Sequence, residues 1–391
     1  MTSQSLPRGV IAIGLVSLFM DISSEMVHSL LPIFLVAVLG ASALSVGIIE
    51  GIAEATAAIA KVFSGVISDW IGRRKPLILL GYGMAALTKP LFPLATGIGA
   101  VLTARFVDRI GKGIRGAPRD ALIADITPPE LRGAAYGLRQ SMDTVGAVVG
   151  PALALVLMAA TSDNFRLVFW VAVIPAFVCI ALIVFGVQEP DVPRTGTARR
   201  FPIRRSEMAR LPARFWLVVG FASMLTLARF SEAFMLLRAE NVGLAVTWIP
   251  VILIVMNVVY AASAYPFGRR SDNGNRKGLL ALGIGFLILA DLVLALATHA
   301  WMVGVGAVFW GLHMGATQGL LTAIIADAAP ADLRGTAFGL FNLLTGLALL
   351  AASILAGWLW TAVGPATTFY AGSAFSAVAM IGLLARRAGA R

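Results

Sequence analysis

The chain has 391 residues, of which 59% are hydrophobic and 13% charged, and its formal net charge is +11. Soluble domains carry about 25% charged residues, so this composition excludes an ordinary soluble domain. The basic residues lie between long apolar segments, which disfavours nucleic-acid binding and favours the loops of a membrane protein.

Long apolar segments follow one another along the chain, and a helix of about 20 apolar residues can cross a bilayer. We therefore expect an all-α membrane protein of about 12 transmembrane helices in two pseudo-symmetric six-helix bundles. The first segment lacks a small-residue cleavage site and is expected to be retained as a helix. The predicted helices are 10–38, 45–68, 76–95, 98–125, 134–160, 166–187, 213–238, 246–267, 279–298, 300–327, 335–362 and 365–385.

The longest polar stretch divides the chain near its middle and contains three prolines and six arginines. It predicts an N-terminal bundle at 1–187, a basic cytoplasmic linker at 188–212 and a C-terminal bundle at 213–391. With both termini in the cytoplasm, the inside loops hold nearly all loop arginines and lysines, and the outside loops hold Arg166 and Arg238. This asymmetry follows the positive-inside rule and predicts a multi-pass protein of a bacterial-type inner or plasma membrane, which we expect to be a monomer.

The two halves share two sequence patterns. The segment from Gly65 through Asp69 to Lys75 returns from Gly268 through Asp272 to Lys277, and Ala124-Asp125 returns as Ala326-Asp327. The copies are 202 or 203 residues apart, which indicates a duplication. An even number of helices in each repeat gives two halves of the same orientation.

These patterns resemble the major facilitator superfamily over essentially the whole chain. The segment Gly65 to Lys75 is similar to the loop that marks the family, with Trp70 where an arginine is usual. Arg105 to Gly111 resembles its conserved-arginine motif, with Asp108 and Arg109 in place of a Gln-Gly pair. The resemblance implies a secondary transporter with no cofactor, whose cavity is lined by helices 1, 4, 7 and 10.

The fifth predicted helix resembles the motif associated with proton-coupled antiporters. That motif covers Gly137, Gly146, Gly150 and Pro151, with Ala154 and Leu155 in place of the closing glycine pair. Glycines and a proline allow close helix packing and a local bend. The alternative is a flexible, lipid-facing helix without any antiporter role.

The loop motif predicts a conformational latch that is intact in one global state and broken in the other. An acid at a helix end can accept hydrogen bonds from arginines and from free backbone N–H groups of a neighbouring helix. The alternative is simple anchoring of the loop. The predicted latch residues are Gly65, Asp69, Gly72, Arg73, Arg74, Asp272 and Arg276.

Ionisable residues inside the predicted helices concentrate in the first half of the chain, and such residues in a membrane are usually functional. Asp21, Glu25 and His28 share one face of the first helix, and Glu50 and Glu54 share a face of the second. On the fourth helix seven charged side chains fall within an arc of about 140°. These are Arg105, Asp108, Arg109, Lys112, Arg115, Arg119 and Asp120, and the fifth helix adds Arg139 and Asp143.

Two interpretations of these charges compete. In the first, acids and bases neutralise one another in a structural network. In the second, a like-charge acid pair in a low dielectric holds a proton, which a nearby arginine can displace. We take Asp21, Glu25, Glu50 and Glu54 as proton-coupling candidates, with Asp21, Glu25 and Glu54 foremost and Arg105 as their counter-charge.

The charge pattern leaves the substrate open. Cations on the fourth helix suit an anionic substrate, and acids on the first helix suit a cationic one. On the tenth predicted helix, Trp310, His313 and Gln318 form a candidate substrate wall, with packing as the alternative. The further cavity candidates are His28, Arg105, Asp108, Arg109, Lys112, Arg115, Arg139 and Asp143. We predict no metal site, because no ligand spacing supports one.

We therefore expect a transporter that exports a small organic compound against protons by antiport. Uptake of an organic anion, proton-coupled or facilitated, is the second candidate. A membrane enzyme is disfavoured because the sequence shows no Ser/His/Asp arrangement and no strand before its one short glycine run, Gly111-Lys-Gly113. A non-transporting receptor or assembly factor and a passive channel are the alternatives from other classes.

Overall fold

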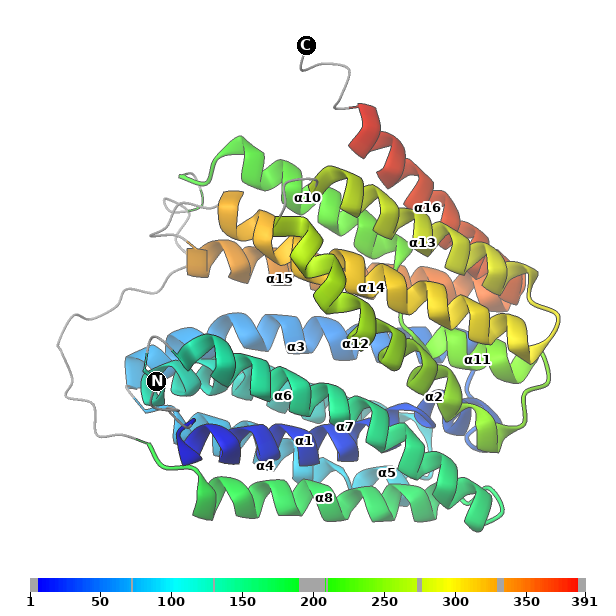
Figure 1. The fold of residues 1–391 in the computed structure, drawn as a ribbon. Helices are drawn as coiled ribbons and strands as arrows, with labels where there is room; N and C mark the ends of the chain where they lie inside the picture. The colour runs from blue at the N-terminus through cyan, green and yellow to red at the C-terminus, as the bar shows by residue number, and fades with distance from the viewer. Residues whose placement is uncertain are drawn as a thin grey trace. The chain divides into compact units, whose positions relative to one another are not determined.

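The computed structural model describes residues 6–71, 73–128, 131–189, 208, 210–272, 276–328 and 334–385. Across these ranges the chain is helical and has no strand (Figure 1). The elements are α1 (Arg8–His28), α2 (Leu31–Ile33), the π-helical turn η1 (Phe34–Val38), α3 (Ala43–Ile71), α4 (Lys75–Thr88), α5 (Leu91–Leu94), α6 (Ile98–Ile126), α7 (Arg132–Ala160) and α8 (Phe165–Gly186). The second half holds α10 (Ala213–Ala228), α11 (Ala233–Asn241), the 3₁₀ turn η3 (Val246–Trp248), α12 (Pro250–Asp272), α13 (Arg276–Leu296), α14 (Ala300–Ala328), α15 (Arg334–Ala362) and α16 (Pro365–Ala385).

The chain divides into two compact units. The first comprises Met1–Leu30 and Thr56–Pro202, and the second comprises Leu31–Ala55 and Ile203–Arg391. Helix α3 therefore gives its first part to the second unit and its remainder to the first. The bundle boundaries at 187 and 213 rest on the polar stretch between them and stay a prediction.

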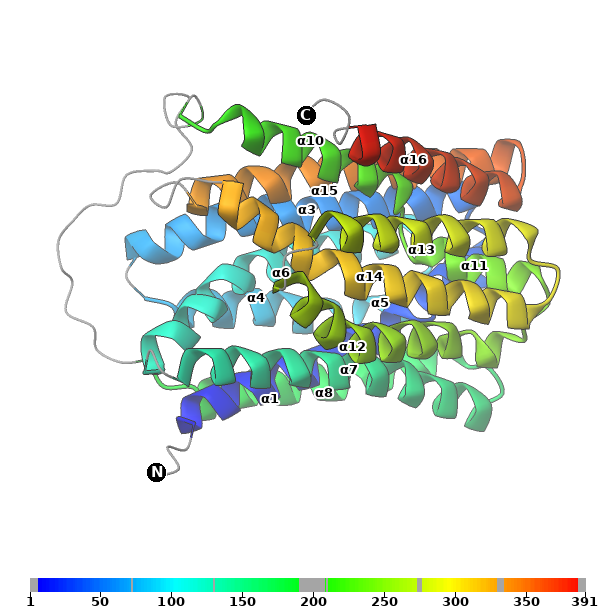
Figure 2. The same cartoon turned by 45° about the horizontal axis from the view of Figure 1, so that its top comes forward.

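In the first unit, α1 packs along α7 and α8, and α4 packs along α6 and α8 (Figures 1 and 2). The apolar core between them includes Ile13 and Met20 of α1, Tyr82 of α4, Leu122 of α6 and Cys179 of α8. Charged residues lie directly beside this core, since the Arg119 Nη1 atom of α6 donates to the Tyr82 hydroxyl at 3.3 Å.

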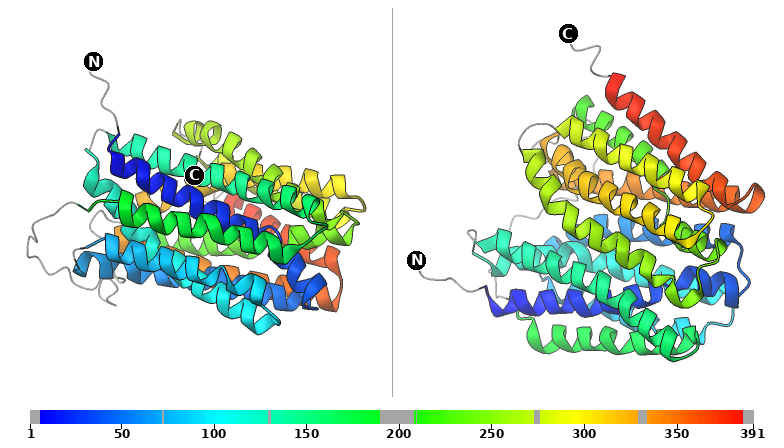
Figure 3. Two further views of the ribbon diagram at one scale, coloured as in Figure 1. Left: turned by 90° about the horizontal axis from the view of Figure 1, so that it is seen from below. Right: turned by 45° about the vertical axis from the view of Figure 1, so that its right-hand side comes forward.

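In the second unit, α14 packs against α12 and α13, while α16 packs against α13 and α10 (Figure 3). Helix α15 packs along α10, and Phe215, Val219, Ile325 and Leu340 form the apolar core at one end. Farther along, the ring of Phe230 lies 5.8 Å from Trp310 and 5.5 Å from Phe369. Aromatic contacts therefore join α14 and α16 to the segment between α10 and α11.

Ten helical segments of the described chain are long and apolar enough to cross a membrane. Large apolar side chains on their outer faces are exposed, among them Ile174 (63%), Phe185 (84%) and Ile381 (66%), as expected of lipid-facing surface. Helices α6 and α14 are 29 residues long but are not among the ten. The count of twelve spans and the side of the termini therefore stay predictions.

Three segments that the sequence predicts as continuous helices are interrupted. Helix α1 ends at His28 before Pro32, and α4 ends at Thr88 before Pro90, because proline lacks the N–H that the next helical hydrogen bond needs. The third break follows Ala228, where Arg229 leaves the helix at φ −102° and ψ 72°. Helix α11 then starts afresh, with the Ala233 N–H donating to the Ser231 Oγ atom.

Candidate functional site

The acidic pair of α1 lies where α7 packs closely against it. A Cβ atom on Gly146 would lie 2.8 Å from the Asp21 Cβ atom and 3.0 Å from a carbonyl oxygen of α1. A Cβ atom on Gly150 would lie 2.7 Å from the Glu25 Cβ atom and 2.8 Å from the Ile22 carbonyl oxygen of α1. Only glycine permits this approach, so the α7 glycines hold the backbone of α7 against both acids.

Asp21 has charged neighbours of both signs. Its carboxyl interacts with Asp143 of α7, with Arg115 and Lys112 of α6, and with Glu25 one turn along α1. Nearby cations stabilise the ionised form of such a carboxyl group, whereas nearby acids stabilise its protonated form. The balance therefore depends on the distance between α1 and α6.

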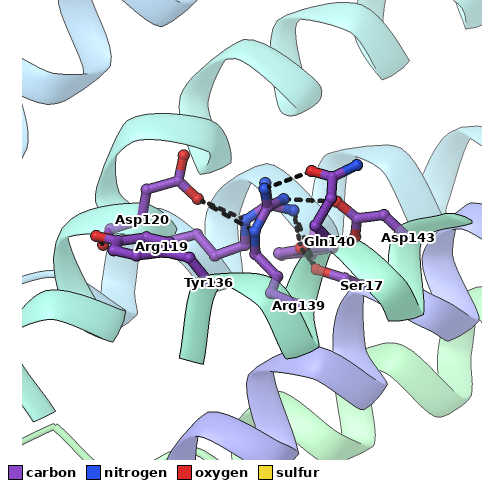
Figure 4. Close-up of polar contacts among 8 residues, drawn as sticks. Ser17, Arg119, Asp120, Tyr136, Arg139, Gln140 and Asp143 are labelled. Atoms are coloured by element: carbon purple, nitrogen blue, oxygen red, sulfur yellow. Dashed lines mark hydrogen bonds and ion pairs between the residues drawn. The ribbon is translucent and has the colours of Figure 1, made fainter. Parts of the chain in front are cut away.

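Around Arg119 and Asp120, a hydrogen-bond network connects four helices (Figure 4). The Arg119 Nη1 atom donates to Ser17 Oγ at 3.0 Å and to Tyr82 OH at 3.3 Å, and Arg119 Nε lies 3.3 Å from Asp120. The hydroxyl of Tyr136 donates to the Asp120 carbonyl at 2.7 Å. The network connects α1, α4, α6 and α7 at one level of the first unit.

Arg139 joins this network to Asp143, the acid of α7. Its Nη1 atom donates to Asp143 Oδ2 at 2.5 Å, and its Nε atom lies 3.8 Å from Asp120 (Figure 4). The spacing of Arg139 and Asp143 on the sequence is therefore realised as a direct ion pair within one helix face.

A second cluster surrounds Asp108. The Lys89 Nζ atom lies 3.1 Å from Asp108 Oδ1 and donates to Ser24 Oγ at 3.1 Å, while Arg109 Nε lies 3.8 Å from Asp108 Oδ2. Arg105 contacts His28 Nδ1 at 2.9 Å through its Nη2 atom. Lys89, Arg105, Asp108 and Arg109 are at most 6% exposed. The cluster holds more positive charge than Asp108 alone can balance.

Sequence reasoning missed Lys89 as a member of the site. It is the one charged residue of the predicted 76–95 helix, and that isolation was the available signal.

Arg115 and Lys112 complete the α6 stripe. The Arg115 guanidinium carbon lies 4.4 Å from the centre of the Tyr82 ring, a cation–π contact. Its Nη1 atom is buried and has no hydrogen-bond partner within the described chain. Lys112 is exposed.

Glu50 and Glu54 lie on the part of α3 that belongs to the second unit, whereas Asp21 and Glu25 belong to the first. Glu50 is 1% exposed and Glu54 is partly buried. Around Glu50, α3 packs tightly on α15, because a Cβ atom on Gly47 would lie 2.2 Å from the Ser353 carbonyl oxygen.

The α14 candidates lie inside the second unit. Trp310 and His313 are each 1% exposed, and the His313 Nδ1 atom lies 2.8 Å from the Gly283 carbonyl oxygen of α13. The Gln318 Oε1 atom accepts from the Tyr260 hydroxyl at 3.0 Å. These contacts join α14 to α12 and α13.

Arg74, one of the predicted latch residues, makes polar contacts at the start of α4. Arg74 donates to Ser68 Oγ at 2.6 Å and lies 3.4 Å from Asp125 at the end of α6, whereas the neighbouring Arg73 is exposed. The Glu189 carboxylate accepts from the backbone N–H groups of Arg74 and Lys75, which caps α4.

Sequence reasoning did not select Asp125 or Glu189, although Asp125 belongs to a repeated motif. Gly65 of the latch motif lies against α6, where its Cβ atom would be 3.3 Å from Ala117. Arg276 begins α13. Gly72 lies outside the described residues, as do the side-chain positions of Asp69 and Asp272 and the surroundings of Gly137.

Comparison with known proteins decides the family. The model of the Major Facilitator Superfamily matches residues 13–257 and 233–390. The chain belongs to this superfamily. It is 31% identical over 390 residues to the uncharacterized MFS-type transporter MJ1317 of Methanocaldococcus jannaschii, covering 97% of this chain and 95% of that one. Superfamily membership makes the chain a non-enzymatic membrane transporter of a small molecule.

Two further likenesses support this assignment. The multidrug resistance protein MdtH of Yersinia enterocolitica is 25% identical over 366 residues, covering 92% of this chain and 88% of that protein. The crystal structure of the nucleoside transporter NupG superposes with a TM-score of 0.77 at 12% identity, covering 96% of this chain and 98% of that chain. At that identity the superposition shows the shared superfamily fold.

Proposed function

We propose that this transporter exports a small organic compound by alternating access and couples the export to protons that enter in the opposite direction. The observation that carries the proposal is the position of Asp21 and Glu25 against Gly146 and Gly150. Two carboxyl groups one helical turn apart, held by a glycine seam in an apolar bundle, can take up and release one proton between them.

The proposed switch is a shift of α6 relative to the α1–α7 pair. Close packing at the glycines makes α1 and α7 move together, while Arg115 and Lys112 interact with Asp21 from α6. When these cations approach, the ionised acid is favoured and the proton leaves; when they retreat, the acid takes up a proton. A shift between two global states thus changes proton affinity.

The name of the Yersinia enterocolitica relative, a multidrug resistance protein, supports export as the direction. We propose that both termini lie on the cytoplasmic side of a bacterial-type inner or plasma membrane, because the loop arginines and lysines follow the positive-inside rule. We also propose that the transporter is a monomer.

Uptake of an organic anion is the second candidate. The excess of positive charge at Lys89, Arg105 and Arg109 around Asp108 favours it, as does the Arg115 Nη1 atom, which has no partner among the described residues. A guanidinium N–H is suited to a carboxylate or phosphate oxygen.

The test uses purified protein in proteoliposomes with ethidium as a cationic probe and benzoate as an anionic one. Transport driven by a pH gradient is compared with exchange of probe in the absence of a gradient. We expect Asp21→Asn, Glu25→Gln and Glu54→Gln to lose gradient-driven ethidium transport and to keep exchange.

Asp163→Asn is the matched control, because it removes an acid from an exposed loop position. Full gradient-driven transport by all three acid variants would refute the proposed coupling. Gradient-driven benzoate accumulation without ethidium transport would favour the anion candidate.

A further inference from the structure

A cavity of about 350 Å³ lies within the second unit, where several helix ends meet. Its lining comes from η1, the start of α3, the end of α11 and the end of α15. The lining residues are Val36, Ala43, Leu237, Glu240, Asn241 and Trp360. Small-molecule sites usually measure about 300–1,000 Å³, so the cavity accommodates a compact ligand or one group of a larger ligand.

Among the described residues that line the cavity, Glu240 is the one with a charged group. Arg238, two residues earlier, does not neutralise it. The Arg238 guanidinium donates to the carbonyl oxygens of Leu294, Ala295 and Ala297 at 3.0, 3.1 and 2.8 Å. Its remaining Nη1 contact is with Asn241 Oδ1 at 2.6 Å.

The Arg238 guanidinium therefore binds the carboxyl end of α13, where a cation complements the helix dipole. Among the residues that the structure describes, the Glu240 side chain has no ion-pair or hydrogen-bond partner. The cavity therefore has one uncompensated negative charge.

An aromatic ring forms another wall of the cavity. The Trp360 ring lies 5.9 Å from the Phe234 ring and 6.3 Å from the Phe369 ring, contacts that fix its orientation. Tryptophan is the side chain that attracts cations most strongly through its ring face. The other walls at Val36, Ala43 and Leu237 are aliphatic and suit the carbon atoms of an organic cation.

We propose that this cavity binds the ammonium group of an organic cation, with Glu240 as counter-ion and Trp360 as the aromatic surface. The same chemistry occurs in free alkylammonium solutes and in the headgroups of ethanolamine and choline lipids. The site shares no residue with the acids of the first unit and does not depend on proton coupling.

The test measures equilibrium binding of radiolabelled benzyltrimethylammonium to the full chain in nanodiscs made only of phosphatidylglycerol. Neopentylbenzene, an uncharged molecule of the same shape, and benzenesulfonate serve as competitors. We expect saturable binding that neither competitor displaces. Glu240→Gln and Trp360→Leu should each weaken binding by about tenfold, because one removes the charge and the other the aromatic ring.

Glu240→Asp keeps the charge and should retain measurable binding, which separates loss of the site from misfolding. Asp163→Asn removes an exposed acid elsewhere and should bind as the unmodified chain does. The proposal is overturned by absence of binding to the unmodified chain, by equal binding to Glu240→Gln, or by displacement with neopentylbenzene.

A second series of nanodiscs identifies the source of the cation. If added phosphatidylethanolamine or phosphatidylcholine competes with the probe and Glu240→Gln abolishes the competition, the ligand is a lipid headgroup. If binding is unchanged by these lipids, the ligand is a solute.

Discussion

The Lys89 Nζ atom and the Asp108 Oδ1 atom lie 3.1 Å apart, with side-chain exposures of 2% and 5%. The pair joins α4 to α6 in the interior of the first unit. Removing one partner of a buried ion pair leaves an uncompensated charge, which costs about 3–5 kcal/mol.

The pair predicts an unequal response to its two single substitutions. Lys89→Met leaves Asp108 with Arg109, whereas Asp108→Asn removes the ion-pair partner of Lys89 and a nearby negative charge from Arg105 and Arg109. We expect Asp108→Asn to lower the melting temperature of purified protein more than Lys89→Met does. The double variant should melt above Asp108→Asn, and a larger loss from Lys89→Met than from Asp108→Asn would contradict this account.

The seam between α1 and α7 predicts that Gly146→Ala is harmful. The new methyl group would overlap the Cβ atom of Asp21 at 2.8 Å, so the two helices must separate, and overpacking of this kind costs about 1–3 kcal/mol. We expect lower thermal stability and slower gradient-driven transport in proteoliposomes.

Gly83→Ala is the matched control for the seam, because no described atom beyond the neighbouring backbone of its own helix lies within 4 Å of the added methyl group. Alanine is favoured over glycine in a helix by about 1 kcal/mol, so this variant should be neutral or slightly stabilised. Equal behaviour of the two alanine variants would show that the seam has no role.

Two adjacent arginines allow a sharp test of the latch. Arg74 contacts Ser68 and Asp125, and Arg73 is exposed. Because hydrogen bonds to charged groups contribute about 1.5–3 kcal/mol, Arg74→Ala should slow transport roughly fivefold or more, while Arg73→Ala stays near the unmodified rate. The measurement is the initial rate of ethidium transport at equal protein content; equal losses at both positions would indicate a role in topology alone.

The sequence supports the family, the repeated halves and the sharing of one face by the α6 charges. Gly146 and Gly150 were expected to permit close helix packing, but the helix they meet depends on tertiary structure. The same limit applies to Arg105 and Arg115. Their positions on one face of α6 do not show whether each side chain contacts α1 or α4 or faces water.

The other features differ in how much the local sequence indicates. A proline marks the helix breaks before Pro32 and Pro90, whereas no local residue marks the break after Ala228. The cavity beside Glu240 takes residues from four elements that are distant in sequence, and no local pattern marks it.

The central claim is that the α1 acids carry the transported proton. The most direct measurement is the interior pH of proteoliposomes loaded with the dye pyranine, followed while ethidium is transported. The account predicts proton movement opposite to ethidium for the unmodified chain and for Asp163→Asn, and none for the Asp21→Asn/Glu25→Gln double variant. Unchanged proton movement in that double variant would contradict the account.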